Sequence, residues 1–254
     1  MHRLAVAVLF FTLSIVMIPA VSAQAQRDPQ AVAIAKLAYQ ALGGTLPNDS
    51  RAVANYDRVA GDSEDTGTIE VLTRGADQTS EKLTNSGGTT QVVYSRGYGF
   101  QKDVKGISRF TLEKSLASNS VVFPIVVIAT AVLNPNSSVQ FVGLESVNGK
   151  GVNHIRICPS SPDQNFTHIT SFGTKDVWVE AGSGLPVQIA YQIFDSEGSA
   201  PIPMALSYSN YRQVGGTMYP FQIQESRNGT PYLALSITNV AFNVGLTDQD
   251  FPLQ

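Results

Sequence analysis

The last third of the chain alternates between apolar and polar residues, in short runs separated by turn signals. Gly-rich steps and Asn228-Gly229 separate the runs. A period of two between turn signals is what an antiparallel sheet with one buried face requires. This feature predicts consecutive hairpins with one apolar face. The apolar positions are Val187, Ile189, Tyr191 and Ile193; Met204, Leu206 and Tyr208; Tyr219, Phe221 and Ile223; and Leu233, Leu235 and Ile237.

The N-terminus has the pattern of a secretory signal peptide. Arg3 precedes an uncharged apolar run from Leu4 to Val21, and small-residue exit sites follow at residues 21–25. A retained N-terminal anchor is the alternative, but Pro19 and the small residues favour cleavage. We therefore expect residues 1–25 to be a signal peptide and residues 26–254 to form one exported, periplasmic domain. No integral membrane span is expected after its removal.

Charge and cysteine content narrow the class of protein. The formal net charge is −3, and no Lys/Arg cluster occurs, so nucleic acid is not an expected partner. Cys158 is the only cysteine. An exported chain with one cysteine has no internal disulfide, so its hydrophobic core must hold the fold.

The first half of the chain predicts a helix and then further strands. Asp28-Pro29 is a helix start, an N-cap acid followed by proline, and the helix is expected to end at Leu42 before Gly43-Gly44. Four or five strands are expected between Arg51 and Phe110. Their probable cores are 52–60, 67–74, 79–85 and 91–100, and a hairpin of 139–147 with 152–158 follows.

Residues 121–133 form an apolar segment without a polar face. The segment is too short to span a bilayer. Its β-branched residues favour a strand, whereas Pro124 suits the first turn of a helix and Asn134-Pro135 is a natural stop. We prefer a short buried helix. Such a helix beside a one-sided sheet must be covered by protein or must face a non-aqueous cavity.

The sequence offers weak candidates for a reaction centre. His154 and Cys158, on one predicted strand, would be roughly 13 Å apart at about 3.3 Å per residue, beyond hydrogen-bond reach. His154 and His168 could share a metal with a carboxylate, but no H-E-x-x-H or paired-cysteine spacing occurs. Ser183 lies between glycines in a predicted hairpin and not in a nucleophile elbow. We expect no catalytic residue, no metal and no cofactor.

These elements predict a mainly β fold with some α. It would be a single large curved antiparallel sheet, an incomplete β-barrel, covered by short helices. A concave apolar surface is suited to holding a hydrophobic ligand in water. The alternative is that helix and sheet pack on each other and leave no space. Strand parity predicts a cavity lined by Tyr94, Ile125, Ile128, Val187, Ile189, Leu206, Tyr208, Phe221, Ile223, Leu235 and Ile237.

The order of elements resembles the outer-membrane lipoprotein carrier family (LolA and LolB) and its relative RseB. The matching pieces are residues 29–42, 67–74, 94–97 and 123–128, together with the tail from Trp178 to Phe251. The resemblance implies a half-barrel that binds lipids or acyl chains. It also places Arg74 where the carriers have an arginine that helps latch a lid, although Gly75 follows where proline is usual.

Three functions are compatible with the sequence. The first is a non-enzymatic, periplasmic binder or carrier of lipids or lipoprotein acyl chains. The second is an envelope sensor or interaction module with a protein partner on the same fold. The third is a hydrolase, which would need Ser, His and Asp side chains brought together by folding.

Overall fold

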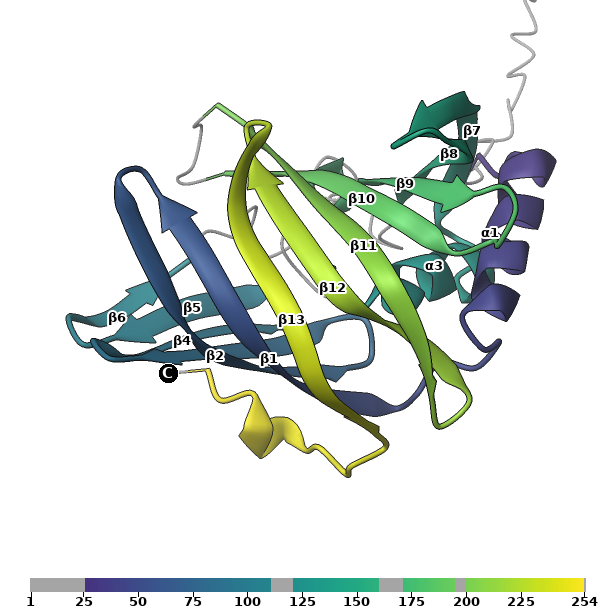
Figure 1. Ribbon diagram of the computed structural model, residues 1–254. Helices are drawn as coiled ribbons and strands as arrows, with labels where there is room; N and C mark the ends of the chain where they lie inside the picture. Colours follow the sequence, from purple (N-terminus) through teal and green to yellow (C-terminus); the bar gives the residue numbers. More distant parts are fainter. Residues whose placement is uncertain (1–25, 111–120, 160–170, 195–199, 254) are drawn as a thin grey trace, which may run out of the picture.

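The strands form one sheet in the computed structural model, which describes residues 26–110, 121–159, 171–194 and 200–253. The sheet curves around an interior and stays open (Figure 1). Its thirteen strands are β1 (Asp49–Ala60), β2 (Ser63–Arg74), β3 (Gln78–Asn85), β4 (Gly88–Ser95), β5 (Tyr98–Asp103), β6 (Gly106–Arg109), β7 (Ser138–Val147), β8 (Lys150–Cys158), β9 (Lys175–Glu180), β10 (Pro186–Ile193), β11 (Ile202–Val214), β12 (Thr217–Arg227) and β13 (Thr230–Phe242).

The strand order is β6-β5-β4-β3-β2-β1-β13-β12-β11-β10-β9-β8-β7. Every neighbouring pair is antiparallel. Pairing of β1 with β13 joins the N-terminal and C-terminal halves, and β6 and β7 form the two ends. The predicted fold class, an incomplete antiparallel barrel with short helices, is confirmed.

The expected strand at residues 91–100 is wrong in one respect, because it is two strands. Arg96 and Gly97 have φ angles of 52° and 83° and turn the chain between β4 and β5. A turn at Arg96 is hard to predict from sequence, because residues other than glycine rarely adopt a positive φ angle. With β6, which lies outside the expected cores, this region contributes six strands instead of four or five.

Both predicted helices are present. Helix α1 (Pro29–Ala41) starts where the Asp28 carboxylate accepts the Gln30 and Ala31 amides, and it packs against β7 and β8. Helix α3 (Pro124–Leu133) begins at proline and buries seven of its residues. It lies inside the curve of the sheet and contacts α1 (Figure 1). The helical interpretation of residues 121–133 is confirmed, and protein covers most of that helix.

The alternation in the C-terminal half has the predicted register. Met204, Leu206 and Tyr208 on β11 are buried, and their neighbours Ala205 and Ser207 are partly exposed. The buried faces of β10–β13 join α1 and α3 in one hydrophobic core. The expected signal peptide and His168 lie outside the described residues.

The C-terminal segment is fixed to the convex side of the sheet, below β1 and β2 (Figure 1). The Asp49 carboxylate, which is buried, accepts hydrogen bonds from the Val244, Gly245 and Leu246 amides at 2.6, 3.1 and 3.0 Å. Phe251 packs with Val93 and Phe100 in a small second core. The segment thus covers the outer face of β4 and β5.

Replacement of Asp49 by asparagine should loosen this segment. Asparagine keeps one acceptor oxygen but loses the charge that strengthens the three hydrogen bonds. We therefore expect the free energy of unfolding to fall by about 1–2 kcal/mol. Chemical denaturation measures the loss, and hydrogen exchange at residues 244–246 locates it. Asp57→Asn, at an exposed position on the same strand, should change neither. Unchanged exchange in Asp49→Asn would contradict the assigned anchor.

Candidate functional site

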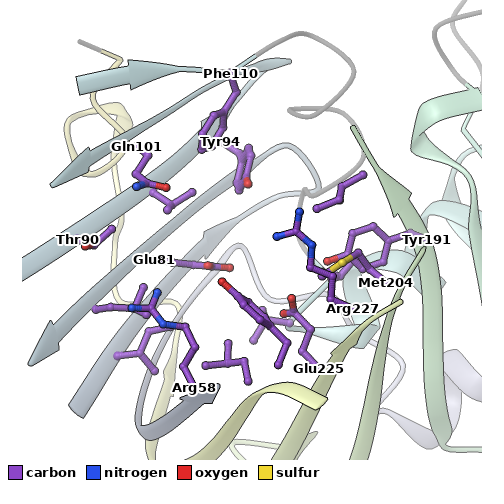
Figure 2. Close-up of a pocket in the computed structure, with 18 of the residues that line it drawn as sticks. Arg58, Glu81, Thr90, Tyr94, Gln101, Phe110, Tyr191, Met204, Glu225 and Arg227 are labelled. Carbon is purple, nitrogen blue, oxygen red and sulfur yellow. The ribbon is translucent and has the colours of Figure 1, made fainter. Parts of the chain in front are cut away.

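A cavity of about 360 Å³ opens on the concave face of the sheet (Figure 2). Its walls come from β1–β5 on one side and from β10–β13 on the other. Of the described residues that line it, none belongs to α3, although Val121 and Val122 lie just before that helix. The helix therefore fills one part of the concave face and leaves another part open. The volume is within the roughly 300–1,000 Å³ typical of small-molecule sites.

Most of the lining residues are apolar or aromatic, but polar atoms contribute the larger share of the exposed wall. The apolar and aromatic residues are Ile69, Leu83, Val92, Tyr94, Phe110, Val121, Val122, Tyr191, Ile193, Met204, Tyr232 and Leu233, and the polar or charged ones are Arg58, Glu81, Thr90, Gln101, Asp103, Glu225 and Arg227. A smaller pocket of about 20 Å³ shares Ile69, Glu81 and Glu225 with this cavity. The two spaces adjoin at the carboxyl groups.

The residues predicted to line a cavity divide into three groups. Tyr94 lines the large cavity, and Leu206, Ile223 and Leu235 line the small pocket. Val187 is only partly buried, because a register shift lies between Pro186 and Gln188. The remainder are buried in the main core around α3: Ile125, Ile128, Ile189, Tyr208, Phe221 and Ile237. Strand parity thus identified the concave face but not which part of it is open.

Arg74, the candidate lid latch, bonds to the C-terminal segment. Its Nη1 donates to Asp248 Oδ1 at 2.6 Å, and Arg96 Nη2 donates to the same oxygen at 2.9 Å. These bonds, with one from Gln78, hold the pKa of Asp248 below its usual value. The partner of Arg74 is thus a tail on the convex side and not a helix over the cavity. A latching role for Arg74 stays a prediction.

Sequence reasoning missed most of the cavity wall, including Glu81 and Glu225. A signal for both was present. Glu81 lies in phase with inward-facing Leu83, and Glu225 continues the alternation of Phe221 and Ile223. A charged residue at an inward position of an apolar strand indicates either a pairing partner or contact with an open space.

Glu81 on β3 and Glu225 on β12 point toward one another across the cavity (Figure 2). Burial raises the pKa of Glu81 to about 7. Burial also raises the pKa of Glu225 to about 8, with a further contribution from the negative charge of Glu81, while Arg227 opposes the shift. Each side chain remains partly accessible because it faces the cavity. Near neutral pH the pair therefore carries at least one proton.

Arg58, also on the cavity wall, has a carboxylate partner. Its Nη2 lies 2.5 Å from Asp65 Oδ2. Asp65 also accepts hydrogen bonds from Tyr56 Oη at 3.0 Å and from Asn85 Nδ2 at 2.6 Å. Despite some desolvation, these donors lower the pKa of Asp65. The Arg58 charge is thus neutralised within the protein.

The two raised pKa values predict a pH-dependent stability. A carboxyl whose pKa is higher in the folded state stabilises the fold below its unfolded pKa, and this contribution is lost as pH rises through the folded value. For Glu81 and Glu225 the loss falls between about pH 4.5 and 8. We expect the double variant Glu81→Gln/Glu225→Gln to gain stability relative to wild type over this window, by on the order of 1 kcal/mol or more. Urea denaturation at pH 5 and pH 8.5 measures it. A difference that does not change with pH would contradict the assignment.

His154 and Cys158 do not form a catalytic pair. Both ring nitrogens of His154 face carboxylates, with Nδ1 at 2.7 Å from Glu145 and Nε2 at 2.8 Å from Asp176. The ring also stacks on Trp178, with centroids 4.2 Å apart. These contacts give the histidine a structural role on the outer face. Within the described ranges, no group of three or more His, Cys, Asp or Glu side chains could hold a metal ion.

Three solved structures share the arrangement of this chain. A protein domain named for outer-membrane lipoprotein sorting, from Vibrio parahaemolyticus, superposes with a TM-score of 0.56 at 14% identity over 87% of this chain and 96% of its own. A LolA superfamily protein from Nitrosomonas europaea superposes with a TM-score of 0.56 at 15% identity, over 88% of this chain and 97% of its own. A DUF1329 family protein from Desulfovibrio piger superposes with a TM-score of 0.53 at 15% identity, over 87% of this chain and 97% of its own.

The chain therefore shares its fold with a LolA superfamily protein and with a domain named for lipoprotein sorting. The resemblance drawn from the order of elements is thereby confirmed at the level of fold. By sequence, the chain matches no protein-family model and no curated protein. In the described part of the chain, no helix is both long and apolar enough to cross a bilayer.

Proposed function

We propose that this protein is an exported, non-enzymatic binder or carrier of a lipid or acyl-chain ligand. The ligand occupies the cavity between β1–β5 and β10–β13. In this proposal residues 1–25 are removed on export, and the protein works in the periplasm. The observation that carries the proposal is the cavity of about 360 Å³ left open beside a helix that fills the rest of the concave face.

The wall of the cavity supports an apolar ligand. Ile69, Leu83 and Val92 face Met204 and Leu233 across it. Each methylene moved from water into such surroundings gains about 0.8 kcal/mol. A chain of about ten methylenes therefore gains roughly 8 kcal/mol, against which the cost of immobilising the ligand is set.

The fold adds a second line of support. One structural neighbour is named for outer-membrane lipoprotein sorting. At 14% identity the likeness concerns the fold alone, so the ligand class is inferred from the cavity of this chain. Lipoprotein acyl chains are the specific ligand that the two observations favour together.

Native mass spectrometry tests the proposal. Protein purified from an envelope extract without detergent should show an added mass that is lost on collisional activation and that organic extraction recovers as lipid. Fluorescent fatty-alcohol probes should bind the delipidated protein. Bare polypeptide throughout, together with no probe binding by folded protein, would refute the function.

A second candidate is an envelope sensor or interaction module. Strand β7 ends the sheet, and Val142 and Leu144 on it are 46% and 75% exposed. Exposed apolar side chains on an edge strand favour contact with a protein partner. Cross-linking from position 144 in the envelope distinguishes the candidates, because a carrier whose ligand occupies the cavity does not need a stable partner at β7.

A further inference from the structure

Glu81 and Glu225 are carboxyl groups on the cavity wall, and Arg227 acts on Glu225 as a nearby positive charge. Among the described residues, neither carboxyl accepts a hydrogen bond or lies in an ion pair, although both face into the cavity. Buried polar groups in native proteins are nearly always paired, and an exception calls for an explanation. A carboxyl that faces an open cavity without a hydrogen bond or ion pair in the protein is available to a ligand.

The surrounding charges make this space favourable for a cation. The charged or titratable groups that face the pair are Arg58, Tyr94, Asp103, Tyr191, Arg227 and Tyr232. Asp65 already neutralises Arg58. Asp103 adds a third carboxylate to the wall, and Arg227 contributes a positive charge that acts on Glu225. Burial raises the pKa of Tyr191, and of Tyr208 and Tyr219 behind it, so these phenols stay neutral.

The apolar surfaces adjoin the carboxyls directly. Glu81 pairs with Val92 on β4 and with Val71 on β2, and Leu83 follows it on the same face. Ile223, Leu206 and Leu235 line the small pocket beside the two carboxyls. A ligand that satisfies both parts of this wall has an alkyl chain and, next to it, a positively charged head group.

We propose that the cavity selects a cationic amphiphile, whose ammonium group lies between Glu81 and Glu225 and whose alkyl chain lies along the apolar wall. This inference rests on the proposed function and names its ligand class. A cation between the two carboxylates offsets the electrostatic repulsion between them. An anionic head group would instead add another negative charge to the site.

Binding of the cation is linked to proton release. In the free protein the carboxyls have pKa values of about 7 and about 8, so the pair is protonated at pH 6 and ionised at pH 9. A cation stabilises the ionised form and lowers both pKa values. Affinity for a fixed positive charge therefore rises with pH over this window, and affinity for a neutral alkyl chain changes less.

A competition experiment tests the inference with ligands that have the same alkyl chain and different head groups. Delipidated protein is first loaded with the neutral fluorophore N-phenylnaphthylamine. It is then titrated below micelle-forming concentrations with dodecyltrimethylammonium, dodecanol or dodecanoate. At pH 8.5 the ammonium should displace the fluorophore at a concentration at least about tenfold lower than dodecanoate requires, which corresponds to one pKa unit of interaction. At pH 6 this preference should shrink severalfold.

One isosteric double variant and a control variant assign the effect. Glu81→Gln/Glu225→Gln should bind the fluorophore and dodecanol as wild type does but lose the ammonium preference and its pH dependence. Glu64→Gln, which removes a carboxylate from an exposed position on β2, should retain both. Equal or tighter binding of dodecanoate, or a preference that survives in the double variant, would overturn the inference while the proposed function stands. If folded protein binds neither the fluorophore nor any dodecyl ligand, both are overturned.

Discussion

Ile128→Ala is expected to lower the free energy of unfolding by about 2–5 kcal/mol, because it removes three methylene-sized groups from a packed core. Ile128 is fully buried on α3, in the core that joins the helices to β10–β13. It does not line the cavity, so the empty volume left by the substitution has no ligand to fill it. The loss should appear as a lower midpoint of urea denaturation at an unchanged slope.

Leu133→Ala is the matched control for this prediction. Leu133 ends the same helix and is 58% exposed, so its truncation should change stability by roughly 0.5 kcal/mol or less. Folded Ile128→Ala protein should still bind a neutral fluorophore with wild-type affinity. Equal stability losses in the two variants, or abolished binding in folded Ile128→Ala, would contradict the division of the concave face into a filled and an open part.

Val92→Trp is expected to weaken binding of an apolar ligand by at least about tenfold. Val92 lies between Glu81 on β3 and Gln101 on β5, and its side chain faces the cavity. An indole ring there takes volume that an alkyl chain would otherwise occupy. Exclusion of two methylenes costs about 1.6 kcal/mol, which exceeds a tenfold change in affinity.

Fluorescence titration of N-phenylnaphthylamine measures this loss. The fold should tolerate the substitution, because the ring enters open space and not a packed core. Leu144→Trp adds an indole at an exposed position of β7 and should leave affinity unchanged. Wild-type affinity in a correctly folded Val92→Trp protein would place the ligand elsewhere.

The sequence predicted the sheet well because its signals are local. The alternation of Met204, Leu206 and Tyr208 is set by pleat geometry, and the start of α1 is set by Asp28-Pro29. Six strands precede α3 instead of four or five, because the turn at Arg96 uses a backbone conformation that arginine rarely adopts and because the short strand β6 lies outside the expected cores.

The open part of the concave face could not be predicted in the same way. Ile125 and Val92 are both apolar, yet Ile125 is packed in the core and Val92 lines the large cavity. The difference depends on where α3 lies against the strands, which is a long-range property. The alternation along β3 and β12 indicates that Glu81 and Glu225 lie on the inner face of the sheet. Their approach across the cavity depends on the curvature of the sheet.

The dependence of affinity on alkyl chain length is the most direct test of the cavity as a ligand site. Neutral alcohols of increasing length should displace N-phenylnaphthylamine at concentrations that fall about fourfold for each added methylene, corresponding to about 0.8 kcal/mol, until the cavity is full. The decline should then level off, and it should level off at a shorter chain in Val92→Trp. Affinity that is independent of chain length, or an identical series in the two proteins, would contradict the account.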